Sequence, residues 1–145
     1  MWGILIALIS GALMAIQGVF NTGVSKQTGT WLTNSWVQLT GLILCIIVWL
    51  VKERQEVGIS DLFQIDNKYM LLGGVIGAFI TLTVMLSMKN LGPAQAVLLI
   101  VIAQVVVAYL IEVFGLFAVE KVGFQWSKLI GVIVAIVGIV IFKWK

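Results

Sequence analysis

Long uncharged apolar runs alternate with short charged segments along this chain of 145 residues. Glu112 is the one charged residue that lies inside such a run rather than between runs or at their ends. A helix rises about 1.5 Å per residue, so about 20 apolar residues cross the roughly 30 Å hydrocarbon layer of a membrane. The runs do not alternate in polarity, as membrane β-strands do. The pattern predicts an all-α membrane protein with five transmembrane helices, at about 2–24, 31–51, 69–88, 93–117 and 126–144.

Aromatic residues stand near the ends of these predicted spans, where the interfacial belt of a membrane protein is expected. They are Trp2, Trp31, Trp49, Tyr69, Trp126 and Trp144. The first run lacks a preceding basic residue and is too long for a cleaved signal peptide, so we expect it to be a span. No linker or low-complexity tract interrupts the chain. Residues 1–145 are therefore expected to form a single multi-pass transmembrane domain.

Composition narrows the possible functions further. The chain is 61% hydrophobic and 10% charged, whereas soluble domains are about half apolar and about a quarter charged. A single soluble core is therefore excluded. Histidine is absent, which removes His-based triads and zinc sites, and the single cysteine, Cys45, has no partner within the chain. No nucleophile–base pair is visible, so the sequence predicts neither an enzyme nor a bound metal or cofactor. The basic residues are scattered singly, which argues against a nucleic-acid partner.

The basic residues are divided almost equally between the two sides of the membrane. Five spans would place five of them with the N-terminus and four on the opposite side. The two groups are Lys52, Arg54, Lys68, Lys121 and Lys128, and Lys26, Lys89, Lys143 and Lys145. Such a balance gives almost no positive-inside preference. One interpretation is that the chain inserts in both orientations and that oppositely oriented copies pair. The other is that the loops are simply short and poor in charge, and that one orientation is slightly preferred.

Amide side chains cluster on single faces of the first two predicted helices. Gln17 and Asn21 are four residues apart on the first helix, and Asn34 and Gln38 repeat this spacing on the second. Gln104 stands near the middle of the fourth predicted helix. We take Gln17, Asn21, Gln38 and Gln104 as candidate substrate-binding residues. Hydrogen bonding between helices without transport is the alternative interpretation.

Glu112 shares a face of the fourth helix with Gln104 and Ala108, at positions i+8, i and i+4. It lies about 11 Å along the helix axis from the middle of the predicted span. A carboxylate at the centre of a membrane costs about 2.5 kcal/mol or more, and less nearer the surface. Because a desolvated carboxyl group can hold a proton, Glu112 is a candidate proton-coupling residue. The alternative is an interfacial Glu112 paired with Lys121 or Lys128.

Small residues on the fifth helix predict a close helix contact. Gly131 and Gly138 are seven residues apart with Ala135 between them, which keeps all three on one seam. We therefore expect Gly131, Ala135 and Gly138 to form a dimer seam.

Several segments together resemble the YdcZ-like family of small five-helix inner-membrane proteins, within the drug/metabolite transporter superfamily. They are Ala15–Asn21, Leu91–Ala94, Ala103–Gln104 and Ile111–Phe117. The family pattern usually has glycine before the glutamine, where this chain has Ala103. It also usually has aspartate followed by histidine or a similar residue, where this chain has Glu112 and Val113. The glycine seam is similar to the one by which small multidrug-resistance transporters dimerise. Their essential first-helix acid is missing here, so their antiport is not carried over.

The resemblance implies one half of a ten-helix inverted-repeat transporter. An antiparallel homodimer, or an opposite-facing homologous subunit, would complete it in the inner membrane with the site near the midplane. The implied function is secondary transport of a small metabolite or organic cation, with proton coupling through Glu112. Its expected partners are a small-molecule substrate and membrane lipid. The alternative is a non-transporting structural or assembly subunit whose polar helix faces only mediate packing.

Overall fold

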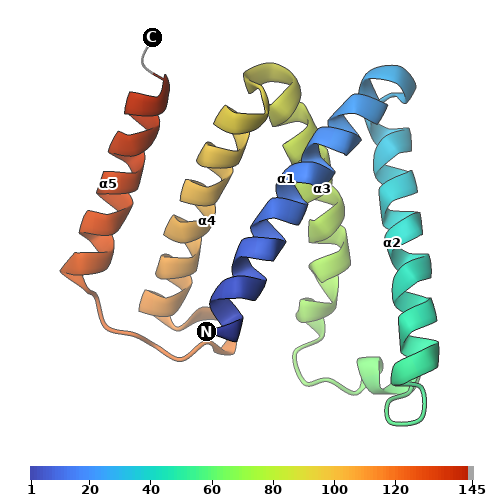
Figure 1. The fold of residues 1–145 in the computed structure, drawn as a ribbon. Coiled ribbons are helices and arrows are strands. Elements are labelled where there is room, and N and C mark those ends of the chain that lie inside the picture. Colours follow the sequence, from blue (N-terminus) through green and yellow to red (C-terminus); the bar gives the residue numbers. More distant parts are fainter. Residues whose placement is uncertain (144–145) are drawn as a thin grey trace. The chain divides into compact units, whose positions relative to one another are not determined.

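A computed structural model describes residues 1–143, and every regular element in that range is helical (Figure 1). The all-α class predicted from the sequence is confirmed for these residues. Contacts group them into two compact units, Met1–Lys89 and the residues from Asn90 onward. Each unit is described by itself.

The first unit consists of long helices and two short 3-10 helices. In chain order these are α1 (Trp2–Thr28), α2 (Thr30–Lys52), η1 (Ile59–Phe63), η2 (Lys68–Leu72) and α3 (Gly73–Leu91), whose last two residues belong to the second unit. The second unit contains α4 (Pro93–Phe114), η3 (Leu116–Ala118) and α5 (Trp126–Lys143). Trp144, the predicted end of the last span, lies outside the described residues.

Glycines with positive φ set three of the helix boundaries. Gly29 (φ 88°) separates α1 from α2 by a single residue, and Gly92 (φ 80°) precedes Pro93 at the start of α4. Gly115 (φ 65°) adopts the left-handed conformation that ends α4. Glycine tolerates this conformation because it has no Cβ. The helix therefore ends at Phe114, three residues before the predicted boundary at Phe117.

Within residues 1–143, four helical segments are long and apolar enough to cross a membrane. They are Trp2–Thr28, Thr30–Lys52, Lys68–Leu91 and Pro93–Phe114. These segments correspond to the first four predicted spans. The fifth predicted span contains a shorter apolar helix, α5, whose 18 residues rise about 27 Å. That length is near the lower limit for crossing, so the fifth span stays a prediction.

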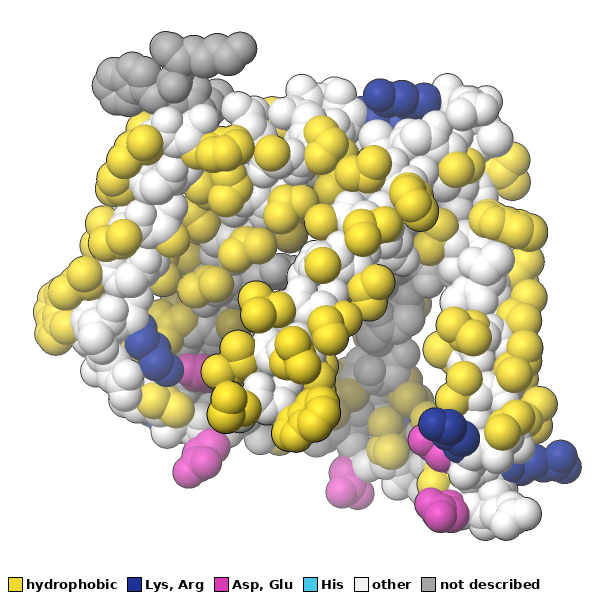
Figure 2. All heavy atoms as spheres, in the orientation of Figure 1, with side chains coloured by type: hydrophobic (Ala, Val, Ile, Leu, Met, Phe, Trp, Pro, Cys, Tyr) yellow, Lys and Arg dark blue, Asp and Glu magenta, His cyan; other side chains and the backbone are white. Residues whose placement is uncertain are grey.

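Hydrophobic side chains lie along the lengths of the helices, while most charged side chains lie near helix ends (Figure 2). Most large apolar side chains of the described residues are exposed, for example Leu8 at 68% and Phe20 at 68%. Lipid chains solvate such surfaces as well as a protein interior would. The exposure is therefore what a membrane-embedded chain requires.

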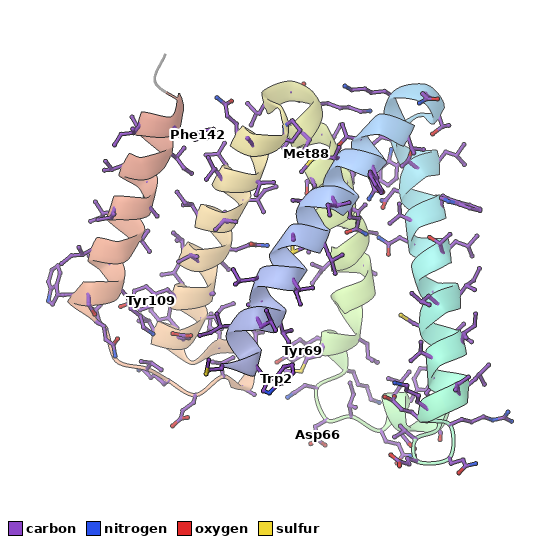
Figure 3. The ribbon with its side chains drawn as sticks, viewed as in Figure 1. Trp2, Asp66, Tyr69, Met88, Tyr109 and Phe142 are labelled. Carbon is purple, nitrogen blue, oxygen red and sulfur yellow. The ribbon has the colours of Figure 1, made fainter. Side chains whose placement is uncertain are left out.

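A contact between α1 and α3 forms part of the interior of the first unit, to which α2 also contributes the buried residues Thr33 and Asn34. Gly18 of α1 faces the side chains of Met88 and Val84 on α3, and Figure 3 shows Met88 where the two helices pass. Met88 is 4% exposed, and Met85 is fully buried. The missing Cβ at Gly18 allows this approach, which is the usual role of small residues at membrane helix contacts.

A lysine joins the end of α3 to the turn between α1 and α2. The Lys89 ammonium donates to the Ser25 carbonyl (3.4 Å) and to the Thr30 hydroxyl (3.2 Å). Across the same turn, the Thr28 and Thr33 hydroxyls lie 3.0 Å apart. These contacts fix the end of the first unit at which its three long helices meet.

Candidate functional site

Gln17 and Asn21 lie together on one face of α1, as their spacing predicts. They line a shallow depression with four apolar neighbours, Leu13, Met14, Ile16 and Phe20. Gln17 is exposed and Asn21 is half-buried. Each amide offers both donors and acceptors, which are costly to leave in hydrocarbon without partners. This face of α1 therefore suits a polar ligand, water or another polar helix face.

The amides of α2 make hydrogen bonds to α3. Asn34 Nδ2 donates to the Ala78 carbonyl (3.0 Å), and Gln38 Nε2 donates to the Thr81 hydroxyl (3.3 Å). Thr81 in turn donates to the carbonyl of Gly77 one turn earlier (3.1 Å). The amide nitrogen of Gln38 thus links α2 to α3. The residue as a whole stays exposed.

Asn34 keeps one unmatched acceptor. The residue is 3% exposed, and its Oδ1 is the one buried side-chain oxygen or nitrogen of the described residues without a hydrogen-bond partner. Rotating the amide would turn this oxygen toward the Ala78 carbonyl, another acceptor, so the present orientation is the favourable one. A buried acceptor without a donor costs about 1–3 kcal/mol. Asn34 therefore presents a point where an N–H or O–H donor would be stabilised.

The second unit places Glu112 in the last turn of α4, paired with a lysine of α5. Glu112 Oε2 and Lys128 Nζ are 2.7 Å apart, and their side chains are 40% and 39% exposed. The Lys128 ammonium also lies 5.4 Å from the centre of the Tyr109 ring, within cation–π range. Of the two lysines considered as interfacial partners, the structure selects Lys128.

Tyr109, near the end of α4 (Figure 3), makes hydrogen bonds to the segment that connects α4 to α5. Its hydroxyl accepts a hydrogen bond from the Gln125 backbone N–H (2.8 Å) and donates to the Gln125 carbonyl (3.2 Å). The Val122 N–H also donates to the carbonyl of Glu112 (2.9 Å). The connection is thus folded back on α4, which brings Lys128 to Glu112.

An open depression of about 370 Å³ lies between α4 and α5. It is lined by Val105, Ala108, Tyr109, Glu112, Lys128, Gly131 and Val132. One end is polar because of the ion pair, and the remainder is apolar. Gln104 is exposed on α4 and is not among these lining residues. Within the second unit, the structure therefore brings Glu112, but not Gln104, into this depression.

The predicted seam residues of α5 are all exposed. A Cβ added at Gly131 or Gly138 meets no described atom within 4 Å, so both positions have room for a partner helix. Gly131 also borders the α4–α5 depression. The dimer seam itself stays a prediction.

Sequence reasoning missed two contributors to these sites. Tyr109 stands three residues before Glu112, on the same helix face, so the spacing rule could have found it. Thr81 belongs to a small-residue series with Gly73 and Gly77, which is typical of simple packing. Its hydroxyl accepts the hydrogen bond of the Gln38 amide, which adds a polar contact to that packing.

Comparison with protein families gives a match over nearly the whole chain. The family described as "Putative inner membrane exporter, YdcZ" matches residues 2–141. Searches of curated proteins and of solved structures found no match.

Proposed function

The chain belongs to the YdcZ family of inner-membrane exporters, and from this premise we propose that it is a secondary transporter of a small metabolite or organic cation. The resemblance noted in the sequence is confirmed by a match that covers residues 2–141. With four helical segments of the described residues able to span a membrane, the chain is a multi-pass inner-membrane protein. Membership of an exporter family favours transport over catalysis, and it is the observation that carries the proposal.

The proposed substrate contacts are the amides Gln17, Asn21, Gln38 and Gln104. Amides can donate to and accept from the same small polar molecule, so they orient a substrate without a fixed charge. The pair on α1 supports this assignment, because both amides line a depression on a segment able to span a membrane. We expect substrate to replace the hydrogen bonds that water makes in the empty transporter.

The proposed working unit is an antiparallel pair of chains. Five helices in one orientation and five in the other would produce the inverted symmetry on which alternating access depends. The five-to-four division of basic residues supports insertion in both orientations. The partner is a second copy or an opposite-facing homologous subunit, with Gly131, Ala135 and Gly138 at the seam.

Glu112 is the proposed proton-coupling residue, acting through its ion pair with Lys128. A proton on Glu112 removes its negative charge and so breaks the attraction that joins α4 to α5 at this end. Loss of the proton restores the pair. Movement of α5 relative to α4 would then follow the protonation state of one carboxyl group, and a substrate that binds the two arrangements differently would be coupled to the proton.

A non-transporting membrane subunit is the second candidate function. The bonds Asn34–Ala78 and Gln38–Thr81 and the pair Glu112–Lys128 are all contacts that hold helices together. These observations favour helix packing as the role of the polar residues. A binding measurement separates the two functions, because a packing role requires no small ligand.

The experiment is a substrate screen on the purified protein in detergent, monitored by intrinsic tryptophan fluorescence. Organic cations, amines and small acids are added singly, and a saturable change identifies a ligand. Gln17→Ala should weaken binding of that ligand at least tenfold, a loss of about 1.4 kcal/mol. Gln55→Ala, in the charged connection after α2, is the matched control and should bind normally.

The same assay tests Glu112. Glu112→Gln preserves the shape of the side chain but removes its titration, so binding should persist in part and lose its dependence on pH. Gln104→Ala should instead weaken binding at every pH. A pH dependence that is unchanged in Glu112→Gln would exclude Glu112 as the coupling residue. Failure of every ligand class to change the fluorescence would favour the packing function.

A further inference from the structure

The segment that follows α2 folds back along the end of that helix. The Trp49 indole N–H donates to the Val57 carbonyl (3.1 Å), which holds the chain beside α2 as it leaves the helix. The short helix η1 follows, near the end of α2 (Figure 1). Between them lies a depression of about 390 Å³, lined by Cys45, Ile46, Trp49, Glu53, Val57, Gly58, Ile59 and Leu62.

The position of Cys45 sets the depth of this depression. Cys45 lies seven residues before Lys52, the last residue of α2, which corresponds to about 10 Å along the helix axis. The 23 residues of α2 rise about 34 Å, so the helix exceeds the hydrocarbon layer only slightly. The wall formed by Cys45 and Ile46 therefore lies within the hydrocarbon layer. Glu53, at the other end of the lining, follows the last residue of α2 and therefore lies near the level of the headgroups.

The lining is apolar except at its outer rim. Ile59 and Leu62 are one 3-10 turn apart on η1, so both contribute to the same wall. The indole N–H of Trp49 is bonded to Val57, so Trp49 contributes an apolar ring to the lining. An apolar depression at this depth does not hold water, because water there would lack hydrogen-bond partners. A hydrocarbon chain fits it.

The carboxylate at the rim indicates the type of headgroup. Glu53, the first residue after α2, is the charged residue among those that line the depression. A carboxylate attracts an ammonium group, and a primary ammonium also donates hydrogen bonds to it. A headgroup with a primary ammonium group therefore matches this rim. We propose that the depression binds one phospholipid with a phosphoethanolamine headgroup, with an acyl chain between α2 and η1 and the ammonium at Glu53.

Trp49 makes the site directly measurable. In a single-tryptophan variant, with the other tryptophans changed to phenylalanine, Trp49 is the sole indole emitter. The protein is placed in phosphatidylcholine vesicles containing a small equal fraction of either brominated phosphatidylethanolamine or brominated phosphatidylglycerol. Bromine quenches indole on contact, so quenching reports which lipid occupies the depression. Trp31, at the opposite end of α2, provides a control reporter in a second single-tryptophan variant.

The proposal predicts that brominated phosphatidylethanolamine quenches Trp49 at least twofold more than brominated phosphatidylglycerol. Trp31 should show no such difference. Glu53→Gln should abolish the preference while leaving quenching by both lipids, and Glu56→Gln, which lies outside the lining, should retain it. Equal quenching of Trp49 by the two lipids, or no quenching, would overturn the site. Loss of the preference in Glu56→Gln would overturn the role of Glu53.

A second measurement avoids the multiple substitutions. Native mass spectrometry of the wild-type chain, released from the same lipid mixture without bromine, should show phosphatidylethanolamine retained in preference to phosphatidylglycerol. Glu53→Gln should reduce that retention severalfold. Equal retention of both lipids by the wild type would overturn the proposal, even if the single-tryptophan variants fail to fold.

Discussion

Replacing Gly18 with leucine should destabilise the first unit by forcing α1 away from α3. A Cβ at Gly18 would stand 2.5 Å from Cε and 2.9 Å from Sδ of Met88, and 3.2 Å from Cγ1 of Val84. Alanine at this position can be accommodated by a shift of the flexible end of Met88, at a cost of about 1 kcal/mol or less. Leucine adds three more carbons to a contact where Met88 is only 4% exposed. Such overpacking costs about 1–3 kcal/mol.

Gly11 provides the matched control for this substitution. It lies on the same side of α1 seven residues earlier, and a Cβ there meets no described atom within 4 Å. Thermal unfolding in detergent should show a Tm for Gly18→Leu lower by roughly 3–12 °C. Gly11→Leu should stay within about 2 °C of wild type, a shift of roughly half a kcal/mol or less. Adding Met88→Ala to Gly18→Leu should recover part of the loss, because it removes the side chain that leucine meets. Equal losses at Gly11 and Gly18, or no recovery with Met88→Ala, would refute this packing.

Three further predictions concern the polar contacts and the assembly. Gln38→Leu should cost about 0.6 kcal/mol, and Thr81→Val at least as much, because it also removes the hydrogen bond to the Gly77 carbonyl. The double variant should cost no more than Thr81→Val alone, and additive losses would contradict the bond between Gln38 and Thr81. Tyr109→Phe should leave the helices intact but speed proteolysis between α4 and α5, and an unchanged cleavage rate would argue against the contacts with Gln125. Gly138→Leu should weaken dimerisation in light scattering without loss of helicity in circular dichroism, and an unchanged dimer would place the seam elsewhere.

The spans were predictable because hydropathy depends on local sequence alone. A run of about 20 apolar residues has few alternatives to a membrane helix, and Gly29 and Pro93 mark boundaries by their own conformational preferences. The predicted end of the fourth span was wrong by three residues because apolar residues continue past Gly115. The hydropathy signal therefore extends beyond the helix. The glycine conformation, rather than polarity, ends that helix.

The candidate site was predictable only within single helices. The common face of Gln17 and Asn21 follows from the helical period. The partner of Gln38, by contrast, is Thr81, and 43 residues separate the two. Periodicity carries no information across such a distance. For Glu112 the sequence left Lys121 and Lys128 as alternative partners. Hydrogen bonds of Val122 and Gln125 hold the connecting segment against α4, and Lys128 is the lysine that pairs with Glu112.

The central claim is that the chain moves a small solute across the inner membrane. Its most direct test is transport by the purified protein in proteoliposomes on a solid-supported membrane, with an imposed proton gradient and each ligand found in the fluorescence screen. The account predicts a substrate-dependent current that saturates, is reduced by Gln17→Ala, and loses its dependence on the proton gradient in Glu112→Gln. Folded, dimeric wild-type protein that binds such a ligand but neither gives a current nor accumulates the ligand inside the liposomes would contradict it.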